Sequence, residues 1–230
     1  MDFSFSSEQD DLRREARAFL EANPAPTIEQ LAELGWVGIL QSEDFTFLDA
    51  AVLFEELGHA LYDGPYVLNE ITGQPGDDLE SIEIDGFVRQ KLLAAFALEA
   101  VGIGAKAIEL AVAYASEREQ FGKKIGSYQA ISHSLVDGYI AVELARSLAY
   151  WAAWSVAENA ADAALAVAAA KSQAAEAAVL ACEKSIQAHG GIGFTWEHPL
   201  HRYYKRALWL EGALGYGREQ RAEIARSLLS

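Results

Sequence analysis

A short segment from Arg118 to Gly122, in the order Arg-Glu-Gln-Phe-Gly, has the residue types of a phosphate-binding turn. A planar guanidinium binds phosphate or pyrophosphate through two parallel hydrogen bonds, and a glycine lets the backbone approach such a ligand. Phe121 would pack beside the ligand, and Gln129 offers a further polar contact. Two structural alternatives stay open. An arginine at a helix end also interacts favourably with the last carbonyl groups, and Gln129 could be an ordinary surface residue.

A second group combines Gln187 with the glycine pair Gly190 and Gly191. Adjacent glycines end a helix readily because they adopt left-handed backbone geometry, so an ordinary helix C-terminus is one interpretation. A binding site that uses the glutamine amide is the other. His189 and His198 have no partners at metal-ligand spacing, and we interpret both as structural.

The composition predicts a mainly helical protein and argues against nucleic-acid binding. The chain has 230 residues, 51% of them hydrophobic, with abundant alanine and long stretches that lack Gly and Pro. A net charge of −16 repels phosphate backbones, although it allows a local basic site for one phosphorylated ligand.

The single cysteine, Cys182, allows no disulfide within the chain, and we expect it to be a small buried residue. The first residues lack a signal-type apolar core, and we interpret the alanine-rich stretch 160–170 as a packed bundle helix rather than a lipid-spanning one. We therefore expect a cytoplasmic protein without a membrane partner.

Capping residues and apolar spacing predict short helices before residue 66 and long ones after residue 90. Ser6 with Gln9 and Thr27 with Gln30 can form capping boxes, and Asp44 or Thr46 can cap a third helix. Helical spacing then predicts a helix from Lys91 and further helices over about 128–156, 160–188, 199–214 and 218–229. Such helices, joined by short turns, predict an antiparallel bundle. Within the first of them, Gly102 and Gly104 should allow close helix packing.

The region between these two sets of helices has few helix signals. Gly73, Pro75, Gly76 and Gly86 interrupt it, and alternation over 82–85 predicts one short strand. We therefore predict an N-terminal helical domain over 1–66, a shortened linker or β-hairpin over 67–90, and a C-terminal helical bundle domain over 91–230.

The Arg118 segment, followed by the stretch from Gln187 to Phe194, resembles the C-terminal helical domain of the acyl-CoA dehydrogenases. The resemblance implies an all-α fold of that type, with the family's middle β-domain reduced to a stub. It also implies that Arg118, Phe121, Gly122 and Gln129 hold the FAD of a neighbouring subunit. Gln187, Gly190 and Gly191 would contact the adenosine half of that FAD.

The same resemblance implies a glutamate that removes a proton next to a thioester carbonyl, while hydride passes to the flavin. A partly buried carboxylate suits this role because its pKa can be tuned toward neutral. In the family register this glutamate would fall at Leu214, or at Leu92 on the first bundle helix. Glu211 is the weak candidate that remains, and a surface carboxylate is its other interpretation. Glu99 does not match either position.

The chain is similar to the shorter subunit of the heterotetrameric acyl-CoA dehydrogenases of actinobacterial steroid side-chain degradation, as the segment from Gly126 to Ala130 illustrates. This implies a subunit that completes the FAD site of a full-length partner in an α2β2 heterotetramer. The substrate would be an acyl-CoA, including a bulky steroid one, and an electron-transferring flavoprotein would be the acceptor. Two alternatives remain: a stand-alone small flavoenzyme that uses Glu211, and a helical scaffold or regulatory subunit without FAD.

Overall fold

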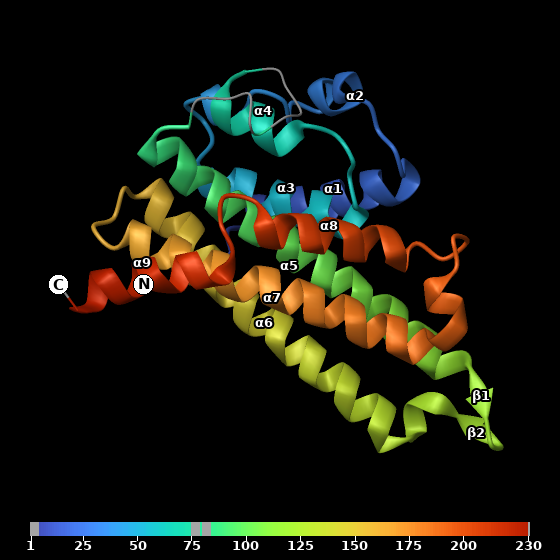
Figure 1. The fold of residues 1–230 in the computed structure, drawn as a ribbon. Helices are drawn as coiled ribbons and strands as arrows, with labels where there is room; N and C mark the ends of the chain where they lie inside the picture. The colour runs from blue at the N-terminus through green and yellow to red at the C-terminus, as the bar shows by residue number, and fades with distance from the viewer. Residues whose placement is uncertain (1–4, 75–78, 80–83, 230) are drawn as a thin grey trace.

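The computed structural model describes residues 5–74, 79 and 84–229, and within them the chain is almost entirely helical (Figure 1). The centre of the molecule is an antiparallel set of three long helices: α5 (Gly86–Glu117), α6 (Gln129–Ala157) and α7 (Ala163–His189). Helix α7 packs against both others and also against α8 (Leu200–Gly212) and α9 (Gly217–Leu229). The predicted helical bundle is therefore confirmed.

The N-terminal helices cover one side of α5. They are α1 (Ser7–Ala22), α2 (Ile28–Glu33), the 3-10 turn η1 (Ile39–Gln41), α3 (Phe47–Ala60) and α4 (Tyr66–Thr72). The capping boxes that begin α1 and α2 form as predicted, and Thr46 rather than Asp44 caps α3 together with Asp49. Helix α3 packs on α5 and α6, while α1 packs on α3.

Helices α3 and α5 approach each other so closely that glycine is required at their contact. A Cβ atom on Gly102 would lie 2.0 Å from the carbonyl oxygen of Glu55, and one on Gly58 would lie 2.2 Å from the carbonyl oxygen of Glu99. A Cβ on Gly104 would lie 2.8 Å from the Val142 side chain of α6. The predicted packing role of Gly102 and Gly104 is confirmed.

A buried acidic residue, Glu55 of α3, joins α1 and α6 to the core. Its carboxylate accepts hydrogen bonds from Arg13 (3.0 Å), Arg146 (2.8 Å) and the Tyr150 hydroxyl (2.6 Å). Burial raises the pKa of Glu55, but the two guanidinium groups outweigh it and the net pKa is lowered. The buried charge is thus fully paired, as a low-dielectric site requires.

The middle region differs from the prediction where the structure describes it. Helix α4 occupies the beginning of the expected linker because Tyr66, Leu68 and Ile71 bury a helical face. Helix α5 already begins at Gly86, with Asp85 as its N-cap, rather than at Lys91. Of the predicted strand over 82–85, residues 82 and 83 lie outside the described residues, and neither described residue belongs to a strand.

One stretch, Ala163–Phe194, is long and apolar enough by length and composition to cross a membrane. It comprises α7 and the turn after it. Within the fold, 67% of its most apolar window is buried against the rest of the chain. This is the environment of a core helix, as predicted for its alanine-rich part, and Cys182 within it is fully buried.

Candidate functional site

The Arg-Glu-Gln-Phe-Gly segment forms a small hairpin between α5 and α6 (Figure 1). Strands β1 (Glu119–Gln120) and β2 (Lys123–Lys124) pair antiparallel, with Glu119 opposite Lys124. Phe121 and Gly122 make the turn with φ angles of 52° and 78°, which is the left-handed geometry that tight hairpins favour. The prediction of a charged turn missed these strands, because two-residue strands leave no periodic signal.

Phe121 is held in a costly position without any gain from packing within the chain. Left-handed geometry disfavours a non-glycine residue by about 1–2 kcal/mol, and the side chain is 94% exposed. Such strain with no internal contact to offset it points to a contact outside the chain.

Arg118 lies at the C-cap of α5, as predicted. Its backbone N–H donates to the carbonyl of Tyr114 (2.9 Å), and its carbonyl accepts from the N–H of Ile125 (2.8 Å). The exposed guanidinium makes no hydrogen bond or ion pair with any described residue. The backbone, not the side chain, makes the capping hydrogen bond, and the guanidinium still lies where the helix dipole favours a cation, so both interpretations of this arginine stay open.

The other predicted residues are equally open. Gln129 begins α6 and Gln187 lies in the last turn of α7; both are exposed, and neither side-chain amide is hydrogen-bonded within the described chain. Gly190 ends α7 with φ 61° and ψ −137°, a conformation that essentially requires glycine. A Cβ on Gly122, Gly190 or Gly191 would meet nothing within 4 Å, so packing within the described chain does not explain these glycines.

The two segments meet at one end of the bundle. The Tyr114 ring of α5 stacks on the His189 ring of α7, with centroids 4.4 Å apart. Ala188 packs against the small cluster that contains Ala115 and Ile125. Here α5 and α7 end, with the 3-10 turns η3 (Ile125–Ser127) and η4 (Gly190–Phe194) beside them. Large exposed side chains gather in these segments, namely Phe121, Ile192, Phe194 and Trp196.

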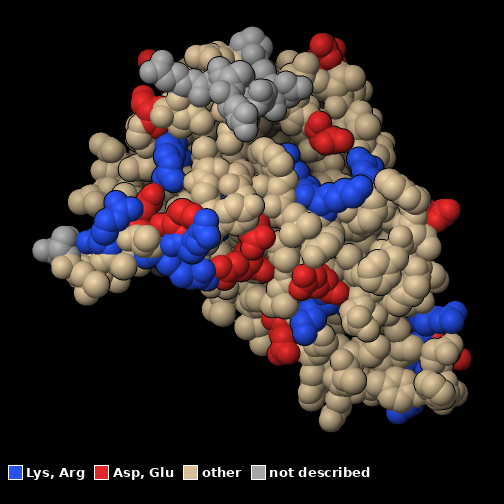
Figure 2. All heavy atoms as spheres, viewed as in Figure 1, with Lys and Arg blue, Asp and Glu red and all other residues tan. Residues whose placement is uncertain are grey.

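The hairpin end gathers three basic residues in a chain of net charge −16, next to the acidic residues Glu117 and Glu119. Figure 2 shows Lys and Arg side chains at this end, where the hairpin contributes Arg118, Lys123 and Lys124. The Lys123 ammonium lies over the Tyr128 ring at 4.2 Å. The site therefore combines positive charge, free hydrogen-bond donors, accessible backbone and exposed aromatic rings, which together suit a dinucleotide.

The candidate bases lie elsewhere. Glu211 is in the last turn of α8, and its carboxylate makes no hydrogen bond to a described residue. Leu214 and the fully buried Leu92 occupy the two positions at which the family glutamate was expected. Glu99 is buried and paired with Arg206 through bonds of 2.6 and 3.1 Å.

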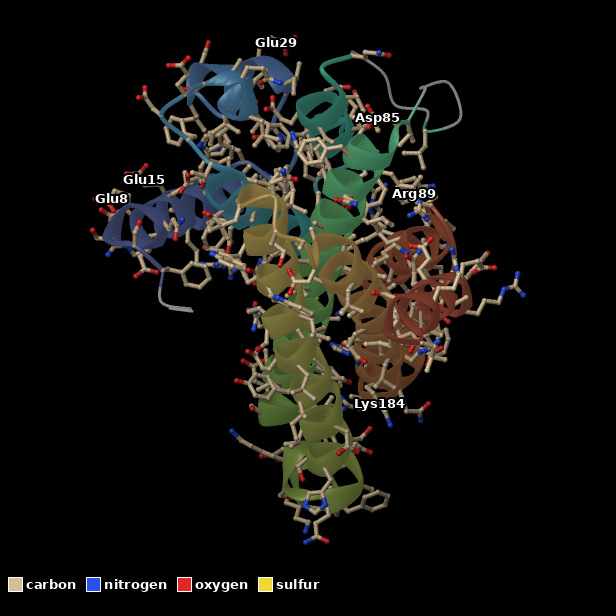
Figure 3. All side chains as sticks on the ribbon, turned by 90° about the vertical axis from the view of Figure 1, so that its left-hand side faces the viewer. Glu8, Glu15, Glu29, Asp85, Arg89 and Lys184 are labelled. Atoms are coloured by element: carbon tan, nitrogen blue, oxygen red, sulfur yellow. The ribbon has the colours of Figure 1, made fainter. Side chains whose placement is uncertain are left out.

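The loop at Leu214 is held by hydrogen bonds to its backbone and offers no catalytic base at that position. Leu214 has a left-handed φ of 56°, and its carbonyl accepts from Arg89 (3.0 Å) and Gln220 (3.2 Å). Figure 3 shows Arg89 on α5 beside the α8 and α9 helices. A leucine side chain cannot accept a proton, so this position carries no base.

The model of the family described as "Acyl-CoA dehydrogenase, C-terminal domain" matches residues 94–229. The chain belongs to the acyl-CoA dehydrogenase family. Acyl-CoA dehydrogenase IpdE2 of Mycobacterium tuberculosis is 42% identical over 112 residues, which are 48% of this chain and 33% of that protein. The chain thus matches about a third of this relative's length.

Two solved structures support the fold. The ChsE4-ChsE5 complex of Mycobacterium tuberculosis has a TM-score of 0.81 at 20% identity, covering 100% of this chain and 99% of that one. The Tcur3481-Tcur3483 steroid acyl-CoA dehydrogenase variant has a TM-score of 0.82 at 19% identity, covering 97% and 99%. At these identities the likeness shows the fold alone.

FAD is the cofactor of this family, and the hairpin end fits its dinucleotide part. The unpaired guanidinium of Arg118 suits the pyrophosphate, and the open backbone at Gly190 and Gly191 suits close approach of the adenosine. The sequence did not reveal the Tyr114–His189 contact that joins the two segments. An aromatic ring four residues before Arg118 was its only sequence signal.

Proposed function

We propose that this chain is a subunit of an FAD-dependent acyl-CoA dehydrogenase complex. It contributes the adenosine and pyrophosphate half of an FAD site to a full-length partner. The partner supplies the base and the surface that covers the flavin ring. Together they dehydrogenate an acyl-CoA thioester between its α and β carbons.

The observation that carries this proposal is that the candidate ligand-binding side chains of the hairpin end face outward from the chain. Arg118, Gln129 and Gln187 have no side-chain hydrogen-bond partners among the described residues, and Phe121 is almost fully exposed. A site that served a ligand held by this chain alone would be expected to fold around it. A half-site completed by a second subunit would instead present these groups at the surface.

The division of roles follows from the same residues. When bound, FAD supplies the hydride acceptor for the reaction. Arg118 would bind the pyrophosphate bidentately, and Gln187 would donate to or accept from the adenosine. Leu214 and Leu92 provide no base in this chain, so proton abstraction falls to the partner.

The relatives support the choice of partner and substrate class. Both solved structures named above contain two different proteins according to their names, and one of them is described as a steroid acyl-CoA dehydrogenase. We therefore propose a heterotetramer with a full-length dehydrogenase subunit and a bulky, steroid-like acyl-CoA as substrate. An electron-transferring flavoprotein is the proposed acceptor.

The test is Arg118→Ala in the complex formed with a co-expressed full-length dehydrogenase subunit. Loss of a charge-assisted bidentate contact of about 1.5–3 kcal/mol should weaken FAD binding roughly 10- to 150-fold. The change should leave the circular dichroism spectrum and melting temperature of this chain unaltered, because the guanidinium makes no hydrogen bond or ion pair with a described residue. Arg226→Ala is the matched control, because this arginine on α9 is also exposed and makes no hydrogen bond or ion pair with a described residue.

Three results would redirect the assignment. Full flavin retention by the Arg118→Ala complex would contradict the half-site. Turnover by the chain alone, abolished in Glu211→Gln, would favour the stand-alone enzyme. A partner complex that forms without flavin, and survives an Arg118 and Gln187 double substitution, would favour the scaffold.

A further inference from the structure

Three aromatic rings form a continuous stack between the two segments of the half-site. Tyr114, His189 and His198 come from the end of α5, the end of α7 and the segment that leads into α8. The Tyr114 and His189 rings are nearly parallel, 23° apart, with centroids separated by 4.4 Å. The His198 ring also packs on His189, with centroids 4.4 Å apart and the rings tilted by 55°.

The orientation of His189 is fixed by its backbone neighbour. The ring is buried, and its Nδ1 lies 2.8 Å from the carbonyl oxygen of Ser185. A carbonyl only accepts, so Nδ1 carries the proton and donates. This bond and the two stacking contacts hold the imidazole against the last turn of α5.

Local hydrogen bonds hold His198 in place. Its Nδ1 accepts from the N–H of Leu200 (3.3 Å), and its backbone carbonyl lies 2.8 Å from Nδ1 of His201. These contacts tie the segment after Gly191 to the start of α8. The rings are therefore anchored to α8 through His198 and to α5 through Tyr114.

Two of the three rings, Tyr114 and His189, adjoin predicted ligand contacts. Tyr114 accepts the backbone N–H of Arg118 through its carbonyl (2.9 Å). His189 follows Gln187 by two positions and immediately precedes Gly190. The spacing between the arginine and the glutamine-glycine segment is thus set by the Tyr114–His189 contact together with the packing of Ala188 on the cluster of Ala115 and Ile125. The side chains of Arg118 and Gln187 make no hydrogen bond or ion pair with a described residue that could fix it.

We propose that His189 is a positioning residue that holds the Arg118 turn and the Gln187–Gly191 segment at the spacing that one dinucleotide spans. The proposal rests on the half-site function above and deepens it. His189 does not contact the ligand in this account. It acts by keeping the two halves of the half-site rigid before the partner and FAD arrive, which reduces the ordering cost of binding.

The first test needs only this chain. Hydrogen exchange should report the Ile125 amide, which bonds Arg118, and the Thr195 amide, which bonds Ile192 (3.0 Å). In His189→Ala both should exchange on the order of tenfold faster, while amides in the middle of α6 stay unchanged. His189→Phe and Tyr114→Phe keep a stacked ring and should leave both rates near those of the unaltered chain. Unchanged exchange in His189→Ala would overturn the proposal.

The second test is a double-mutant cycle on the FAD affinity of the complex. His189→Ala should weaken FAD binding on the order of tenfold, but should add little once Arg118 is already alanine. His189→Phe should restore the affinity. A residue that merely stabilised the fold would lower the melting temperature without this coupling to Arg118, whose side chain makes no hydrogen bond or ion pair with a described residue.

The outcomes separate the two proposals. If Arg118→Ala weakens FAD binding and His189→Ala does not, or if the two effects simply add, the positioning role is wrong and the half-site stands. If Arg118→Ala leaves FAD binding unchanged, the half-site itself is wrong and the role of His189 falls with it.

Discussion

Lys171 gives a sharp test of the electrostatics of the core. It lies within α7, and only 1% of its surface is exposed. Its ammonium donates long hydrogen bonds to the carbonyl oxygens of Glu211 (3.3 Å) and Gly215 (3.4 Å). The Glu211 carbonyl belongs to the last turn of α8, where the helix dipole favours a cation, and Gly215 lies in the turn that follows.

Burial lowers the pKa of Lys171 from 10.5 to about 8, although Glu211 opposes the change. At about 1.4 kcal/mol per pKa unit, the charged form is disfavoured in the folded state by roughly 3 kcal/mol. Below about pH 8 both states bind the proton and the penalty is complete. As pH rises toward 10.5 only the unfolded state keeps the proton, so the penalty disappears and the stability of the folded state rises.

The perturbation is Lys171→Met, which keeps an aliphatic chain of similar length and removes the charge. Urea unfolding followed by circular dichroism, from about pH 7 to about pH 10.5, gives the free energy of unfolding of both proteins. The stability of the variant minus that of the unaltered chain should fall by roughly 3 kcal/mol across this range. Subtraction of the two profiles removes the contribution of other titrating groups.

Lys184→Met is the matched control, because it removes a lysine from a less buried position of the same helix (Figure 3). The reasoning is refuted if the stability difference for Lys171→Met stays constant with pH. Such a result would mean that the ammonium is solvated in the folded state as well as in the unfolded one.

Two further predictions concern packing and acid stability. Gly102→Ala should destabilise the fold by about 3 kcal/mol, because its Cβ would lie 2.0 Å from a carbonyl oxygen of α3. A thermal melt measures this effect. Gly86→Ala is the control and should not lower the melting temperature, because its Cβ would have no neighbour within 4 Å. The His59 hydrogen bond lowers the pKa of Glu109 from 4.5 to about 2. The stability that this bond contributes is therefore complete above pH 4.5 and is lost as pH falls toward 2. Because Glu109 is half exposed, the loss should be on the order of 1 kcal/mol and absent in Glu109→Gln, as acid titration of urea unfolding would show.

Local features of the fold could be predicted because they depend on residues close in sequence. Capping boxes at Ser6 and Thr27 need only a side chain three residues away, and both form. The ends of α6 and α7 fall within a few residues of their predicted positions. Helix α4 was missed because its burial against η1 and α5, rather than a capping signal, stabilises it.

The candidate site was predictable in part for the same reason. Arg118, Gly122, Gln187 and Gly190 belong to two short segments whose residue order is informative by itself. Their exposure could not be derived from that order, nor could the lack of side-chain hydrogen-bond partners for Arg118 and Gln187 among the described residues, because a partner side chain can come from anywhere in the chain. The roles of these residues toward FAD remain a proposal that the experiments above test.

The sequence alone determined that the chain is helical and that it carries the two segments from which we propose a dinucleotide half-site. It also placed leucine at each position where we expected the family glutamate. Each of these depends on residue identity and local spacing. Only the tertiary structure decided that Tyr114 meets His189, that Glu55 is shared by Arg13 and Arg146, and that Lys171 lies beneath the end of α8. These contacts join residues far apart along the chain. They depend on how the helices pack together, and no local sequence pattern encodes that packing.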